Sequence, residues 1–161
     1  MTAAYYSTVL DHPVETVWSL IRDFNNYPVY IDGVTESVIE DDGRGDEVGA
    51  VRCFHYGGNR IRQRLGAHSD DQRFLTYVGI DPFEVPAGAV CETPARTRYE
   101  GTMQLLPVVD GARTFIEWSV TLDPVSGRAE PWRNLLLSLI AEWTDSLRRT
   151  LDRNAVEGLR A

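Results

Sequence analysis

The apolar residues near the end of the chain recur with the period of an α-helix. Between residues 131 and 153 they fall three or four positions apart and form one stripe, which consists of Trp132, Leu136, Leu139, Ile140, Trp143, Leu147 and Leu151. A helix of this extent is roughly 34 Å long, at about 1.5 Å per residue. It therefore needs a large apolar partner surface.

The residues between 33 and 123 follow a different pattern, in which apolar and polar positions alternate. They predict strands at about residues 33–40, 48–56, 60–68, 73–80, 98–108 and 114–123. A further short strand is expected at residues 5–10. Turn-forming sequences at residues 41–43 (DDG) and 57–59 (GGN) join successive strands, so we expect hairpins in series and an antiparallel sheet.

Two short helical segments are expected after the first strand. Pro13 suits the first position of a helix and Glu15 lies in its first turn, and a shorter helical or turn segment follows at residues 25–31. The sequence thus predicts one α+β domain spanning residues 1–161. In this fold, a curved antiparallel sheet of seven strands wraps around a long C-terminal helix.

The alternation also predicts which side chains face that helix. In residues 114–123 the inward set includes Trp118, and in residues 60–68 it includes Gln63. Arg52 shares the inward face of its strand, where an unpaired charge is costly. We expect a structural ion pair with an acid of the terminal helix, such as Glu142 or Asp145, in preference to a role toward a ligand.

Two segments stay ambiguous. In residues 73–80 either Leu75 and Tyr77 or the alternate positions could face inward, since both sets are apolar. Residues 81–95 form a connection that is longer than a compact domain normally needs, with three prolines in it. Such loops act as lids or binding segments, or they are mobile.

Composition and charge exclude several classes of protein. The net charge of −8 repels polyphosphate and anionic lipid, which argues against nucleic-acid binding and against a basic membrane patch. No apolar run is long enough to span a bilayer and no leader pattern is present, so no stable membrane insertion and a cytoplasmic location are expected. Two cysteines, Cys53 and Cys91, cannot build a disulfide framework.

The common catalytic motifs are absent from the sequence. There is no glycine-rich phosphate loop, no nucleophile elbow and no zinc-binding His-Glu-x-x-His segment. The three histidines, His12, His55 and His68, are scattered over different predicted elements. We therefore expect neither a metal nor an organic cofactor.

Several segments resemble one superfamily. They are PVETVWSLIRDFNNYPVYIDGV (13–34), EVGAVRCF (47–54), RYEGTMQLLPVVDG (98–111) and FIEWSVTLDP (115–124). With the order of elements, they resemble the helix-grip fold of the START and birch-pollen-allergen (Bet v 1-like) superfamily, also called SRPBCC. The similarity is to its bacterial polyketide-cyclase/dehydrase and lipid-transport branch, and it covers essentially the whole chain. Because this fold hosts both carriers and enzymes, the resemblance is specific for fold rather than for function.

The resemblance implies a ligand site between the sheet and the terminal helix, reached past residues 57–59 and 81–95. By strand position, the implied pocket-lining residues are Phe54, Tyr56, Gln63, Tyr77, Tyr99, Gly101, Trp118, Leu139 and Trp143. Gly101, which has no side chain at an inward position, is expected to leave room for the ligand. Relatives often carry glutamate where this chain has Gln63, which removes one candidate acid or base.

Tyr99, Tyr77 and Arg52 are the candidates for chemistry. A phenol in an apolar cavity can hydrogen-bond a ligand carbonyl or act as a weak acid near an enolate. Arg52 could pair with a ligand carboxylate or polarise a carbonyl group. Alternatively, both tyrosines are structural core residues whose hydroxyls form hydrogen bonds with the backbone or with water.

Two functional classes remain open. In the first, the protein binds a bulky hydrophobic small molecule, lipid-like, aromatic or polyketide, and carries or senses it. In the second, it is a cofactor-independent polyketide cyclase or aromatase that uses the same cavity to hold a flexible substrate in reactive conformers. The few polar candidates favour binding. A monomer or a homodimer would suit either class.

Overall fold

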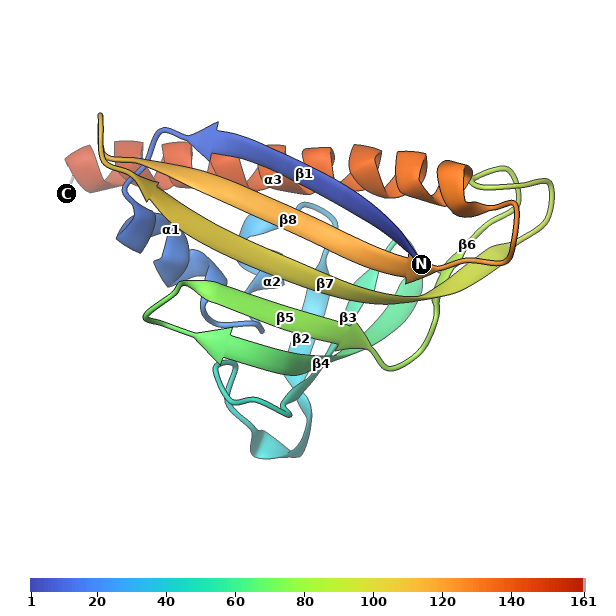
Figure 1. The fold of residues 1–161 in the computed structure, drawn as a ribbon. Coiled ribbons are helices and arrows are strands. Elements are labelled where there is room, and N and C mark those ends of the chain that lie inside the picture. Colours follow the sequence, from blue (N-terminus) through green and yellow to red (C-terminus); the bar gives the residue numbers. More distant parts are fainter. Residues whose placement is uncertain (161) are drawn as a thin grey trace.

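The C-terminal helix lies along a curved antiparallel sheet in the computed structural model, which describes residues 1–160 (Figure 1). In chain order the elements are β1 (Thr2–Leu10), α1 (Val14–Ile21), α2 (Tyr27–Tyr30), β2 (Thr35–Ile39), the 3-10 turn η1 (Glu40–Asp42), β3 (Val51–Tyr56), β4 (Asn59–Ser69), β5 (Phe74–Gly79), β6 (Phe83–Val85), β7 (Ala95–Val108), β8 (Arg113–Asp123) and α3 (Ala129–Arg160). This arrangement confirms the predicted α+β helix-grip fold.

The strands follow the order β1-β8-β7-β5-β4-β3-β2, and every neighbouring pair is antiparallel. The seven strands of this path match the predicted set, although β3 begins only at Val51. An eighth strand, β6, pairs with the start of β7 through Phe83 and Thr97. It lies inside the segment expected to be a loop. The loop prediction for 81–95 was therefore wrong at β6, because β7 begins at Ala95 and offers a longer pairing edge than the sequence indicated.

Helix α3 carries the predicted apolar stripe and extends beyond it. Trp132, Leu136, Ile140, Leu147 and Leu151 are buried, whereas the other two members of the stripe are only half-buried. Residues 152–159 are exposed throughout. These last turns therefore bury little surface against the sheet, although Asp152 contacts His12, and they continue the helix mainly by local hydrogen bonding and propensity.

The inward faces of the strands follow the alternation. Trp118 in β8 is buried, as expected, and so are its neighbours two positions away on either side. In β5, Leu75 and Tyr77 are buried while Val78 is 36% exposed, which resolves the ambiguity of that strand. The inner surface of the sheet thus carries several large aromatic rings next to α3.

Two tyrosines of the inner face lie over glycines of the opposite strand. Tyr77 pairs with Gly101 across β5 and β7, and a Cβ atom at Gly101 would overlap the Tyr77 ring. A Cβ atom at Gly79 would likewise overlap the ring of Tyr99. Aromatic rings that cover glycines in this way replace the missing side-chain packing of a strand. The expectation that Gly101 leaves room for a ligand was wrong, because Tyr77 already fills that space.

This packing predicts opposite effects for two glycine-to-alanine substitutions. Gly101→Ala should lower the free energy of unfolding by about 1–3 kcal/mol, since the Tyr77 ring must move off its strand. Gly158→Ala, in α3 with no atom within 4 Å of the new methyl group, should raise it by up to about 1 kcal/mol. Urea denaturation of both variants measures the difference. Equal free energies of unfolding for the two variants would show that the packing of the Tyr77 ring does not require glycine at position 101.

None of the helices in the described residues has an apolar stretch long enough to cross a lipid bilayer.

Candidate functional site

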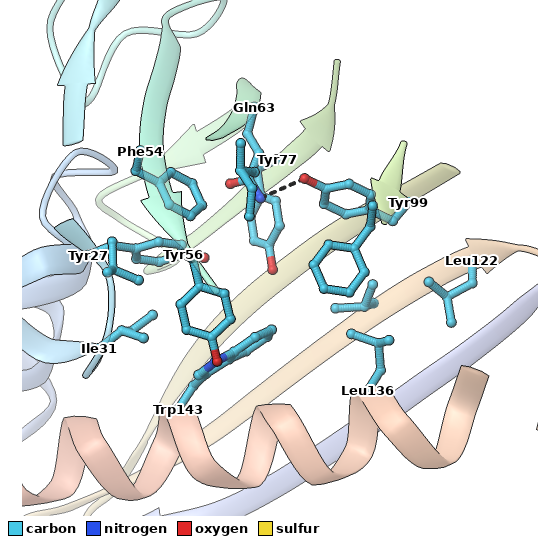
Figure 2. A pocket seen from close by; sticks show the side chains of 14 residues that line it. Tyr27, Ile31, Phe54, Tyr56, Gln63, Tyr77, Tyr99, Leu122, Leu136 and Trp143 are labelled. Carbon is cyan, nitrogen blue, oxygen red and sulfur yellow. Dashed lines mark hydrogen bonds between the residues drawn. The ribbon is translucent and has the colours of Figure 1, made fainter. Parts of the chain in front are cut away.

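A cavity lies between the inner face of the sheet and α3. Its walls come from α2, from strands β3 to β8 and from one side of α3 (Figure 2). The surface of the cavity is almost entirely carbon, although Gln63 and several tyrosines contribute to it. The volume of the cavity is only about 40 Å³. In this conformation side chains thus nearly fill the cavity.

Six of the nine predicted ligand-binding residues line the cavity: Phe54, Tyr56, Gln63, Tyr77, Tyr99 and Trp143. The other three do not. Gly101 lies beneath the Tyr77 ring. Trp118 is buried, and its Nε1 contacts the Tyr77 hydroxyl. Leu139 is half-buried on α3 and does not reach the cavity, which α3 lines with Leu136 and Trp143 instead.

The structure also places residues at the cavity that the sequence did not indicate. Tyr27 comes from α2 and Ile31 is the residue after it, and both lie in the segment 13–34 that was noted only for its family resemblance. Phe83 enters from β6, and its ring centroid is 5.9 Å from that of Tyr99 and 6.2 Å from that of Trp132. Phe83 lies in the segment assigned to a loop, so strand alternation gave no signal for it.

Arg52 is almost completely buried and has no carboxylate partner among residues 1–160. Its guanidinium carbon lies 3.6 Å from the ring centroid of Tyr27 and 4.1 Å from that of Phe24, and only 1% of the residue is exposed. The expected ion pair with Glu142 or Asp145 was wrong, because both acids are exposed on α3. Aromatic faces and hydrogen bonds stabilise the charge instead.

The hydrogen bonds of Arg52 fix the orientation of the Gln63 amide. Arg52 donates from Nε to Gln63 Oε1 at 2.8 Å, and from Nη1 to the backbone carbonyl of Phe24. Arginine has no acceptor, so the Gln63 atom that faces it must be the oxygen. Gln63 therefore turns its Nε2 toward the Tyr99 hydroxyl, to which it donates at 2.9 Å (Figure 2).

Two further phenols accept hydrogen bonds from tryptophan. Trp118 Nε1 donates to the Tyr77 hydroxyl at 3.0 Å, and Trp143 Nε1 donates to the Tyr56 hydroxyl at 2.9 Å. The indole nitrogen is only a donor, so each of these phenol oxygens acts as the acceptor. Figure 2 shows Tyr56 standing against Trp143 beside α3. Three of the four tyrosines that line the cavity are thus held in place by fixed N–H groups.

The pKa values of the buried phenols are raised. Burial raises the pKa of Tyr99 to about 12, more than the hydrogen bond from Gln63 and the charge of Arg52 lower it. Burial also raises the pKa of Tyr77 well above its ordinary value. Both phenols are therefore neutral at pH 7, and they are better suited to donating a hydrogen bond than to releasing a proton.

The histidines lie apart from the cavity, and each has its own neighbour. His12 Nε2 lies 2.7 Å from Asp152, His55 Nδ1 lies 3.2 Å from Glu36, and His68 contacts the backbone carbonyl of Arg22. Within the described part of the chain, no group of three metal-ligating side chains comes together.

The sequence from residue 1 to residue 155 matches the family model described as polyketide cyclase/dehydrase and lipid transport. The chain belongs to this family. Membership supports a role in hydrophobic ligand binding or in cyclisation. A comparison with curated proteins finds no match.

Solved structures share the fold over nearly the whole length. A protein from Nitrosospira multiformis is 31% identical, with 90% of this chain and 95% of that chain covered and a TM-score of 0.68. XoxI from Bacillus cereus is 25% identical, with 94% and 96% covered and a TM-score of 0.75. The di-domain ARO/CYC BexL from the BE-7585A biosynthetic pathway is 14% identical, with 94% and 47% covered and a TM-score of 0.72. This last similarity shows the fold alone.

The Gln63–Tyr99 hydrogen bond of this family member should contribute measurably to its stability. Tyr99→Phe leaves the buried Gln63 Nε2 without a partner, which should lower the free energy of unfolding by about 1–3 kcal/mol. Tyr56→Phe removes the same atom from a half-buried pair, where water can replace it, and should cost less than about 1 kcal/mol. Denaturant titrations compare the two. A smaller loss for Tyr99→Phe than for Tyr56→Phe would contradict the assigned hydrogen bonds.

Proposed function

We propose that this protein binds a bulky, mostly apolar small molecule in the cavity between the sheet and α3. The observation that carries the proposal is the composition of the cavity wall. Aromatic and aliphatic side chains from α2, the sheet and α3 converge on one space, and the few polar atoms among them already bond to one another. Ligand pockets of proteins combine an apolar wall with a few fixed polar groups in this way.

A bulky ligand requires the cavity to open. The cavity volume of about 40 Å³ holds only a few water molecules, at roughly 10–15 Å³ each. Ile61, Phe83 and Tyr99 line both this cavity and a surface groove of about 390 Å³ beside residues 59–62 and 81–84. These three side chains form the partition between the two spaces.

Strand β6 is the element best placed to move. It consists of three residues and pairs with β7 alone, so few hydrogen bonds hold it. Its Phe83 covers Tyr99 and Trp132 at the end of the cavity. Displacing β6 would remove Phe83 from the partition and connect the groove with the cavity. This geometry supports access to the ligand site past residues 57–59 and 81–95.

A cyclase function is the second candidate, and the Tyr99 hydroxyl favours it. Gln63, itself bonded to Arg52, holds this hydroxyl just beneath the cavity surface. Once the cavity widens, the hydroxyl could donate a hydrogen bond to a carbonyl oxygen that gains negative charge during enolisation. A carrier would return its ligand chemically unchanged. A cyclase would return a linear polyketone as a product lighter by one or more waters, which mass spectrometry of the extracted ligand distinguishes.

A cavity-filling variant tests the proposed binding site. Val120 lines the cavity, and Val120→Phe should occupy the remaining space and weaken binding of the neutral fluorescent probe N-phenyl-1-naphthylamine by about tenfold or more. Val78→Phe makes the same change at an exposed position of β5 and should leave the affinity unchanged. Fluorescence titration gives both dissociation constants. Near-UV circular dichroism confirms that each variant is folded.

Equal affinities of the two variants would place the probe outside the cavity. A wild-type protein that does not bind the probe at all would contradict the proposed function.

A further inference from the structure

The charge of Arg52, which contacts the cavity-lining residue Gln63, is the least expected feature near the cavity. The guanidinium is buried, and no carboxylate of residues 1–160 forms an ion pair with it. Its hydrogen-bond acceptors are the neutral oxygens of Gln63 and of the Phe24 backbone. Proteins normally pair a buried charge with an opposite one, because an uncompensated charge in an apolar interior is costly. A buried cation without an ion-pair partner therefore lies directly behind Gln63, one of the residues that line the cavity.

The hydrogen bonds transmit this polarity toward the cavity, where the Tyr99 hydroxyl lies just beneath the carbon surface of the free protein. Arg52 donates to Gln63 Oε1, and Gln63 Nε2 donates to the Tyr99 oxygen, so both bonds run in the same direction. The Tyr99 proton has no acceptor within the described residues. Because its oxygen already accepts a bond, the free function of Tyr99 at the cavity is to donate. Tyr56 has the same polarity, since Trp143 donates to its oxygen.

We propose that the ligand is an apolar molecule with an anionic oxygen, such as a carboxylate or an enolate, which accepts the proton of Tyr99 and compensates the charge of Arg52. This inference rests on the proposed function and specifies the chemical class of its ligand. An anion at Tyr99 would be the last acceptor in a chain of hydrogen bonds that begins at a cation. Such chains strengthen each of their bonds in a low-dielectric environment.

Ligands of other charge fit this wall poorly. A cation would meet the positive charge of Arg52, and a group that only donates hydrogen bonds would find no acceptor at Tyr99 or Tyr56. The net charge of −8 does not oppose an anion inside the cavity, because the surrounding solvent screens most surface charges over about 8–10 Å. The local arrangement of donors therefore determines the selectivity.

Three naphthalene probes of similar shape test the proposal. They are 2-naphthoate, which is anionic, 2-naphthaldehyde, which is a neutral acceptor, and 2-naphthylmethylammonium, which is a cationic donor. At pH 7, calorimetric titration should show that the wild-type protein binds naphthoate about tenfold or more tightly than the aldehyde. Binding of the ammonium should be weaker than that of both.

Gln63→Glu should abolish this preference. The new carboxylate would pair with Arg52 and accept the Tyr99 proton, so the naphthoate affinity should fall to that of the aldehyde. Gln72→Glu is the matched control, because it adds the same charge on the exposed turn between β4 and β5 and should leave the preference unchanged. If Gln63→Glu does not fold, Tyr99→Phe is used instead, and it should lose the preference for naphthoate over the aldehyde in the same way.

The outcomes separate the two proposals. Equal affinities of the wild-type protein for naphthoate and the aldehyde would overturn the inference and leave the binding function standing. A preference that survives both Gln63→Glu and Tyr99→Phe would also overturn it, and would place the anion at the arginines of the outer groove, Arg60 and Arg96. If neither the naphthalene probes nor N-phenyl-1-naphthylamine binds, the proposed function itself fails.

Discussion

The guanidinium of Arg52 is the constraint around which the cavity wall is organised. Aromatic faces from the α1–α2 region and the sheet enclose it, and its hydrogen bonds orient Gln63 and, through Gln63, Tyr99. Removing the guanidinium would leave Gln63 Oε1 and the backbone carbonyl of Phe24 without their donor. The choice of glutamine rather than a carboxylate at position 63 determines that the charge remains uncompensated in the free protein.

Helix α3 and the sheet enclose an apolar space beside the hydrogen bonds that link Arg52, Gln63 and Tyr99. The stripe of α3 packs on strands whose inner faces carry large rings, and two of those rings lie over glycines instead of filling the gap. The remaining volume is small because Phe83 and the Tyr56–Trp143 pair close in on it. Stability and access are therefore coupled, since ligand uptake must displace side chains that also close the core.

Local patterns predicted the fold and one part of the site. The α3 stripe and the β8 alternation have a single apolar face, so they identified the buried side and placed Trp118 there. Strand β5 has apolar residues on both faces, and only its register with β4 and β7 selects Tyr77. Strand β6 depends on pairing with a distant segment, so Phe83 gave no local signal. Leu139 was expected at the cavity from the family resemblance alone, whereas α3 lines the cavity with Leu136 and Trp143.

In a crystal structure of the complex with 2-naphthoate at pH 7, we expect the naphthalene ring between the sheet and α3. A carboxylate oxygen should lie within hydrogen-bond distance of the Tyr99 hydroxyl, with Gln63 still bonded to Arg52. Phe83 should have moved away from Tyr99. Naphthoate bound only in the outer groove, with the inner cavity closed as in the free protein, would contradict the account.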